Sequence, residues 1–228
     1  MAPCNINFHG TGAAISVNGP INGWGLKGIG ITVVSTDSAA HGLAAFSTSF
    51  GDVENFVVNN VPGIGILEFV NSGGQASFFN AWRNIQCRMS PASPSAQCVH
   101  IGSNQSGTDN FGDSWDNVSV IPTAAGQFSL YVGSADSMTF NRLTVDPGNS
   151  NIVFVYAEYP DWPASIAFFN ADFGYGNHVS NYGTPGPGAA PNYLVATSTT
   201  NTGGVPNLPN LIAVPQMGIP AASASLQK

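Results

Sequence analysis

Short runs of β-branched and aromatic residues recur along the chain, divided by Gly, Asn, Asp, Ser and Pro. They lie about ten residues apart, a spacing typical of all-β sandwiches and barrels. Strong helix formers are scarce, whereas 27 Gly and 16 Pro interrupt the sequence. The pattern therefore predicts an all-β chain of antiparallel strands, a β-sandwich of jelly-roll type with little helix. The expected strands cover residues 29–34, 56–58, 65–70, 118–121, 128–132 and 152–156.

An internal similarity divides the chain into two parts. The tetrapeptide Phe-Phe-Asn-Ala occupies residues 78–81 and returns at residues 168–171, 90 positions later. Three further pairs keep the same order at offsets of 84 to 91: Glu68 and Glu158, Asp52 and Asp136, Trp24 and Trp115. The spacing is longer than a solenoid repeat and there are only two copies. We expect two tandem-duplicated β units, residues 5–95 and 98–180, with chance similarity as the alternative.

The C-terminal part has a different composition. Residues 183–228 hold seven of the 16 prolines and one charged residue, Lys228. Proline excludes helix and central-strand pairing, so residues 205–228 cannot order themselves by local structure. We expect a Pro/Gly-rich extended arm at 183–228, whose apolar side chains lie on a neighbouring subunit.

The low content of charged residues limits the kinds of partner that the chain can bind. Only 7% of residues are charged, against about 25% in typical soluble domains, and the net charge is -7 with five cations. Such a surface cannot neutralise a run of phosphates, which disfavours nucleic acid and anionic membrane. No apolar stretch approaches the length of a membrane span. A nearly uncharged surface associates readily, because little repulsion opposes contact.

The N-terminal sequence MAPCNINFHG has neither the basic region nor the apolar core of a signal peptide. Cys87 and Cys98 flank a Pro/Ser-rich loop, which favours a disulfide in an oxidising compartment; two reduced thiols on neighbouring strands are the alternative. Cys4 is left over. We expect an extracellular or virion location.

Candidate chemistry is sparse. Asp109, Asp113 and Asp116 lie within eight residues and could wrap Ca²⁺, although an Asx-rich turn explains the same pattern. The four histidines are scattered, and no nucleophile elbow, dinucleotide fingerprint or P-loop occurs. We expect no enzymatic activity and no cofactor other than calcium at this loop.

The run Trp115-Asp-Asn-Val-Ser-Val120 resembles the closing strand of bacterial jelly-roll carbohydrate-binding modules. The resemblance covers six residues and implies exposed aromatic rings that stack on sugars. A place in the core is the alternative for each ring. The candidates are Trp24, Trp82, Trp115, Trp162 and Tyr175.

Two functional hypotheses follow. The first is a non-enzymatic structural protein of a larger assembly, most simply a virion subunit (a phage or virus capsid, minor capsid or decoration protein), which self-assembles or binds other structural subunits through its C-terminal arm. The second is a carbohydrate-binding module or lectin that binds glycans.

Overall fold

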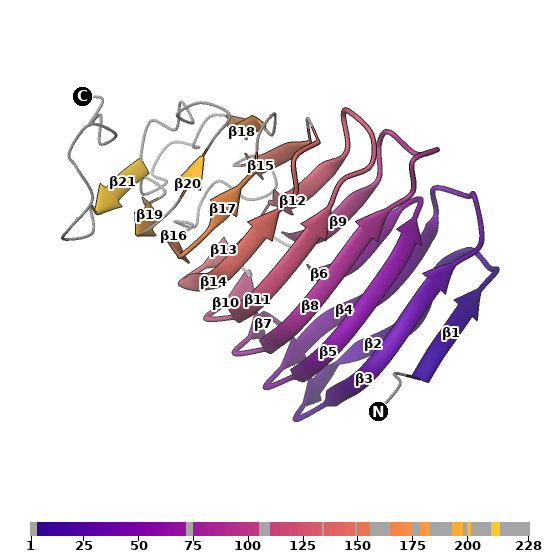
Figure 1. Cartoon of the computed structure of the whole chain (residues 1–228). Coiled ribbons are helices and arrows are strands. Elements are labelled where there is room, and N and C mark those ends of the chain that lie inside the picture. Colours follow the sequence, from indigo (N-terminus) through magenta and orange to yellow (C-terminus); the bar gives the residue numbers. More distant parts are fainter. Residues whose placement is uncertain are drawn as a thin grey trace.

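The computed structural model describes residues 4–71, 75–104, 110–133, 135–148, 150–155, 165–174, 178–182, 193–197, 200–201 and 211–214. Every regular element within these residues is a β-strand, so the prediction of an all-β chain is confirmed. No helix in this part of the chain is long and apolar enough to cross a membrane. The strands form an 11-stranded sheet, here sheet A, and a 10-stranded sheet, sheet B (Figure 1).

The two sheets take their strands from the whole length of the chain. Sheet A contains β1 (Cys4–Phe8), β3 (Gly25–Val33), β5 (Asp52–Val61), β8 (Ala81–Met89), β11 (Ser114–Ile121), β14 (Met138–Val145), β16 (Ser165–Phe169), β17 (Asp172–Phe173), β19 (Tyr193–Thr197), β20 (Thr200–Asn201) and β21 (Leu211–Val214). Sheet B contains β2 (Gly12–Asn22), β4 (Ala40–Ser49), β6 (Ile64–Val70), β7 (Ser77–Phe78), β9 (Gln97–Ser103), β10 (Asn110–Phe111), β12 (Phe128–Val132), β13 (Ala135–Asp136), β15 (Asn151–Val155) and β18 (His178–Tyr182).

The chain passes from one sheet to the other and back, and each round, or coil, lies against the previous one. Strand order in sheet A follows chain order, and the pairs along it are parallel. Coils of 27, 29, 33 and 25 residues separate the equivalent positions Gly25, Asp52, Ala81, Ser114 and Thr139. The fold is a two-sided parallel β-solenoid, in which each coil contacts only its neighbours (Figure 1).

The expectation of an antiparallel jelly-roll sandwich is therefore wrong. Alternating strands and Gly/Asn turns look the same in both architectures, because alternation reports only that one strand face is buried. A parallel pair needs a crossover of about a dozen or more residues. Here the crossover is the strand of the opposite sheet together with its two corners, as between β3 and β5, which are joined through β4.

The repeated tetrapeptide is not a structural repeat. Ala81 is equivalent, through β11 and β14, to Ala167 at 86 residues, so the offset of 90 misaligns the two copies by four positions. Phe79 lies at a corner, whereas Phe169 lies within β16. Both sheets continue across residues 95–98, and the division into units 5–95 and 98–180 stays a prediction.

The repeat that successive coils do share is a left-handed residue within β3, β5, β8, β11 and β14 of sheet A, and directly after β16. It directs two successive side chains outward, such as Arg83 and Asn84, between the inward Trp82 and Ile85. Asn tolerates this conformation better than most residues, and Asn84 and Asn117 each donate a side-chain hydrogen bond to the preceding coil. The residues are Gly28, Asn55, Asn84, Asn117, Arg142 and Asn170, with φ between 52° and 67°.

The stretch from Trp115 to Val120 is one copy of this coil repeat, with Trp115 inward, Asp116 and Asn117 outward and Val118 inward. It therefore resembles a jelly-roll closing strand only in how inward and outward side chains alternate along the strand. The same pattern brings one aromatic ring of each coil into the interior.

These interior rings form a continuous stack, here called the inner ladder: Trp82, Trp115, Phe140 and Phe168. Their centroids are 4.6, 5.7 and 5.2 Å apart in that order, and each side chain is at most 1% exposed. Burial of large rings, with stacking in addition, makes this ladder the centre of the core.

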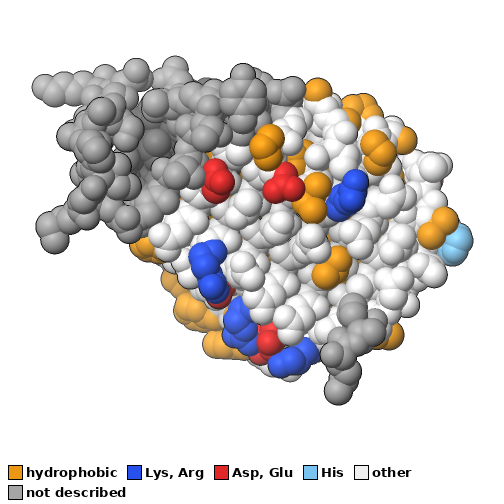
Figure 2. Space-filling model, viewed as in Figure 1, with side chains coloured by type: hydrophobic (Ala, Val, Ile, Leu, Met, Phe, Trp, Pro, Cys, Tyr) orange, Lys and Arg blue, Asp and Glu red, His pale blue; other side chains and the backbone are white. Residues whose placement is uncertain are grey.

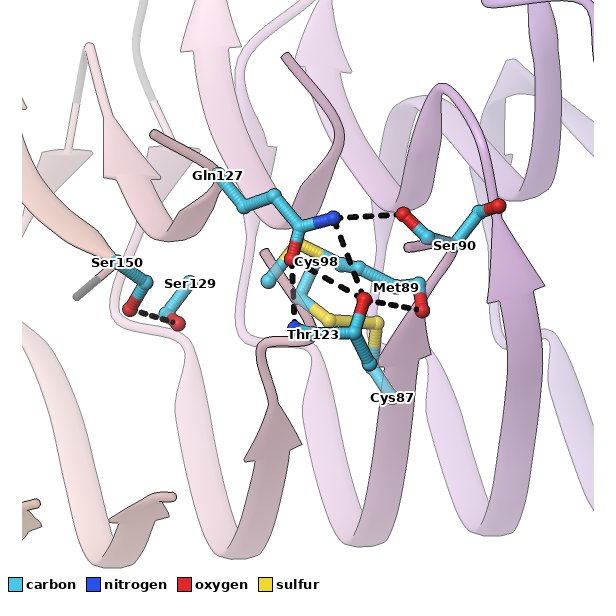
Figure 3. The surroundings of a disulfide bond; sticks show 8 residues. All are labelled: Cys87, Met89, Ser90, Cys98, Thr123, Gln127, Ser129 and Ser150. Atoms are coloured by element: carbon cyan, nitrogen blue, oxygen red, sulfur yellow. Dashed lines mark hydrogen bonds between the residues drawn. A yellow bond between two sulfur atoms is a disulfide. The ribbon is translucent and has the colours of Figure 1, made fainter. Parts of the chain in front are cut away.

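A disulfide joins the two sheets within one coil (Figure 3). Cys87 of β8 and Cys98 of β9 are both buried, and their Cα atoms lie 5.8 Å apart. The structure thus has the disulfide expected from the loop between them. Nearby, buried Gln127 donates hydrogen bonds to the carbonyls of Ser90 and Ser93 at 2.7 and 3.0 Å, which ties this corner to the next coil.

Candidate functional site

The corner at which the chain passes from sheet B to sheet A combines buried carboxyl groups on its inner side with exposed aromatic rings on its outer side. Its inner side carries a carboxyl group on β6. Glu68 is fully buried and points inward, in register with Ala45 and Ile101 of the neighbouring coils. An ionised carboxylate buried here without partners would destabilise the fold strongly. The hydrogen-bond partners of Glu68 therefore decide whether the fold can accommodate it.

Asn80 provides most of those partners. Its Nδ2 donates to Oε1 of Glu68 at 2.7 Å, and its Oδ1 accepts from the backbone N–H of Gly51 at 2.8 Å. Its own backbone N–H donates to Oδ1 of Asp113, and the hydroxyl of Ser77 donates to Glu68 at 3.2 Å. One asparagine thus links three successive coils.

Glu68 and Asp113 form a buried acid pair. Burial raises the pKa of Glu68; burial together with the adjacent Glu68 raises the pKa of Asp113 well above its usual value. One oxygen of each carboxyl, Oε2 of Glu68 and Oδ2 of Asp113, has no hydrogen-bond partner among the described residues. A proton held between these two carboxyls would give both oxygens a partner. The pair is sealed from solvent and is suited to holding the corner together.

The outer side of the same corner carries four phenylalanines, here called the corner row: Phe50, Phe78, Phe79 and Phe111. Phe50, Phe79 and Phe111 are 55%, 50% and 36% exposed. Neighbouring rings lie 5.4 to 5.8 Å apart, centroid to centroid. Backbone hydrogen bonds from Phe50 to Phe78 and from Phe79 to Phe111 hold successive coils together at this edge.

The backbone of the corner row is unusual. In the coils of β3, β5, β8 and β11, the residue two positions before the strand of sheet A has a left-handed φ. In the coils of β3 and β11 this residue is glycine: Gly23 at 72° and Gly112 at 70°. Phe50 and Phe79 occupy the same position at 52° and 57°. The Phe79 ring lies over Gly112, where an added Cβ would come within 2.6 Å of it. A bulky side chain in this conformation costs about 1–2 kcal/mol, so these rings are exposed at the expense of folding stability.

Beside the corner row, the outer face of sheet A carries a line of charges, here called the charge row: Lys27, Glu54, Arg83, Asp116 and Arg142. Lys27 bonds Glu54 at 2.6 Å and Arg142 bonds Asp116 at 2.7 Å, while Arg83 bonds Asp52. The hydrogen bond from Lys27 lowers the pKa of Glu54. Figure 2 shows blue and red side chains gathered near the edge of this face, with hydrophobic side chains beyond them.

The structure separates the three predicted calcium ligands. Asp113 points into the interior, whereas Asp116 lies on the outer face with Arg142, and Asp109 is outside the described residues. Within the described part of the chain, no group of three His, Cys, Asp or Glu side chains could hold a metal ion. Calcium binding stays a prediction that these positions do not support.

The aromatic candidates for sugar stacking are distributed in a similar way. Trp82 and Trp115 are core residues of the inner ladder, and half-buried Trp24 packs edge-on against Trp82, with ring centroids 6.0 Å apart. Trp162 and Tyr175 lie outside the described residues.

Sequence analysis missed the rings that are exposed. Their signal is a phenylalanine at a turn, directly before a glycine or asparagine, as in Phe50-Gly51, Phe79-Asn80 and Phe111-Gly112. No local pattern marks the acid pair, because Glu68, Asn80 and Asp113 are brought together by coil register alone.

No protein-family model, curated protein or solved structure matches the chain.

Proposed function

We propose that the chain is a non-enzymatic structural subunit that self-assembles by burying its corner row against a neighbouring subunit. The observation that carries the proposal is the backbone of Phe50 and Phe79. Both hold large exposed rings in a left-handed conformation, where the coils of β3 and β11 have glycine. Strain that opposes folding is expected at functional positions, and a contiguous apolar patch is typical of an interaction surface.

The charged groups support a structural role over catalysis. The acid pair has the raised pKa values that a proton-transfer site needs, but Glu68 and Asp113 are fully buried, out of reach of a substrate. Members of the charge row neutralise one another in salt bridges.

The proposal places the contact elsewhere than the C-terminal arm. Within the arm, β21 pairs with β19 of its own chain as the last strand of sheet A, which agrees with prolines at either end of an edge strand. A contribution of residues 205–228 to assembly stays a prediction, as does the virion setting. Glycan binding loses its main support, because Trp82 and Trp115 are buried in the core and the jelly-roll pattern is absent.

Sedimentation velocity of the purified chain, at tens of micromolar, tests the proposal. We expect an oligomer that the double variant Phe50→Ser/Phe79→Ser converts to a folded monomer. Phe169→Ser is the matched control: Phe169 is 39% exposed on the outer face of β16, away from the corner row, and its loss should leave the oligomer intact. A monomeric wild-type chain, or an oligomer insensitive to the double variant, would overturn the proposal.

A further inference from the structure

We infer that the neighbouring subunit is a second copy of this chain, lying antiparallel and related by a two-fold axis between β5 and β8. The inference rests on the proposed function and specifies its geometry. Two features of the surface carry it: the sign of successive charges in the charge row, and the position of each ring in the corner row.

The charge row alternates in sign along the solenoid. In register, Lys27 on β3 is positive, Glu54 on β5 negative, Arg83 on β8 positive and Asp116 on β11 negative. On β14 the register position is Asn141, and the positive Arg142 is the next residue. Successive strands are about 4.8 Å apart, so the row presents opposite charges at a regular spacing. The corner row runs beside it, since Phe50 and Phe79 precede Glu54 and Arg83 by four residues each.

Two-fold symmetry permits two arrangements of facing rows. If the axis runs along the solenoid, each strand faces its own copy and every charge meets a like charge, which is unfavourable. If the axis runs across the solenoid, the copies are antiparallel, and corner row still faces corner row while charge row faces charge row. With the axis between β5 and β8, Lys27 faces Asp116 of the other copy and Glu54 faces Arg83, so that each facing pair is of opposite sign.

The same axis fits the rings. Phe50 and Phe79, the most exposed members of the corner row, meet Phe79 and Phe50 of the other copy. Gly23 meets Gly112, the neighbour of Phe111, and the surroundings of Gly23 are open: an added Cβ there would have no atom within 4 Å. Shifting the axis by one strand toward β11 would instead place Phe79 against Gly112 and Phe50 against Ser137, burying less of the exposed ring area.

A mixing experiment tests this geometry. Glu54→Arg and Arg83→Glu, each alone, create like-charged pairs across the axis and should weaken self-association by about tenfold or more. In an equimolar mixture, the arginine introduced at position 54 of one variant faces the glutamate introduced at position 83 of the other. The native Arg83 of the first variant likewise faces the native Glu54 of the second, so the heterodimer regains complementary charges. Native mass spectrometry separates the three dimers by mass. All proteins carry Cys4→Ser, because Cys4 is exposed and would form intermolecular disulfides.

We expect the heterodimer to dominate the mixture, with an affinity within a few-fold of the parent chain. Local repulsion within each variant, such as that between the introduced arginine and Lys27, is unchanged by mixing, so recovery can arise only between copies. A mixture that associates no better than its components overturns the geometry, and the axis shifted by one strand also gives no recovery. If mixing does not restore association but Phe50→Ser/Phe79→Ser still yields monomer, the proposed function stands and this arrangement is wrong. If neither the charge variants nor the double variant changes the oligomer, the proposed function and this arrangement are both wrong.

Discussion

Two rows of aromatic side chains, the inner ladder and the corner row, follow the solenoid axis. They differ in burial, in ring stacking and in backbone conformation. The inner ladder is at most 1% exposed, whereas the exposed rings of the corner row range from 36% to 55%. Trp82 and Trp115 sit on extended strands and stack in parallel, with an interplanar angle of 5°. Phe50 and Phe79 sit in left-handed turns. Parallel register stacks the same position of successive coils, so aromatic residues form rows both inside and outside the solenoid. The inner rings stabilise the fold by burial, whereas the outer rings contribute little and sit on a strained backbone.

The largest expected difference between the rows is in folding stability. Trp115→Ala removes a fully buried ring between Trp82 and Phe140 and should lower the free energy of unfolding by about 3–5 kcal/mol. Phe79→Ala, the matched change in the corner row, should cost about 1 kcal/mol or less, since its ring is half exposed. Urea unfolding of both variants measures the difference. Equal losses would contradict the distinction between inner ladder and corner row.

The acid pair lies just inside the corner row and should make the stability of the corner depend on pH. The folded-state pKa values of Glu68 and Asp113 are raised, so their contribution is complete below the usual carboxyl range and is lost as pH rises through the raised values. Stability should therefore fall toward alkaline pH, by roughly 1–3 kcal/mol, the cost of an unsatisfied buried group.

Glu68→Gln should reduce this alkaline loss, because the amide oxygen still accepts from Asn80 and the amide N–H can donate to ionised Asp113, while the buried Asp113 still titrates. Urea unfolding at about pH 5 and about pH 9 compares the two proteins. Glu54→Gln is the control, since the pKa of Glu54 is lowered and its removal should leave the alkaline loss unchanged. Equal stability of the parent chain at both pH values would contradict the shared proton.

The smallest expected effect concerns the strain of the corner row. At position 79, with φ of 57°, glycine adopts the native backbone without the Cβ penalty. Phe79→Gly should therefore be more stable than Phe79→Ala by about 1 kcal/mol, the reverse of the order in a strand interior. Calorimetric unfolding measures both variants. If alanine proves the more stable, the backbone is not strained and the argument for an exposed functional ring weakens.

Parts of this structure were predictable from local pattern. The run Phe128 to Val132 is β12 residue for residue, and the runs at 56–58 and 118–121 lie within β5 and β11. The disulfide was also predictable, because a Pro/Ser loop of modest length between two cysteines favours closure. The true repeat was present as well, in Trp82-Arg-Asn-Ile85, Trp115-Asp-Asn-Val118 and Phe168-Phe-Asn-Ala171.

That repeat escaped notice because coil length varies from 25 to 33 residues and only a left-handed φ is common to all copies. A comparison at fixed offset instead selected an identical tetrapeptide whose copies lie four positions apart in register. Identical amino acids were thus less informative about the repeat than a shared backbone conformation. Gly28, Asn84 and Arg142 differ in type but fill the same left-handed position.

By itself, then, the sequence determines that this chain is all-β, where many of its strands lie and which cysteines can close a loop, because alternation and turn propensity act over a few residues. Parallel pairing, coil register, and the meeting of Glu68, Asn80 and Asp113 were decided only by the tertiary structure. Each depends on which strand a coil lies against, a choice made by contacts between residues some 25 to 33 positions apart. The same register places Trp115 in the interior of the solenoid and Phe79 on its surface. It therefore decides which aromatic residues can contact a partner.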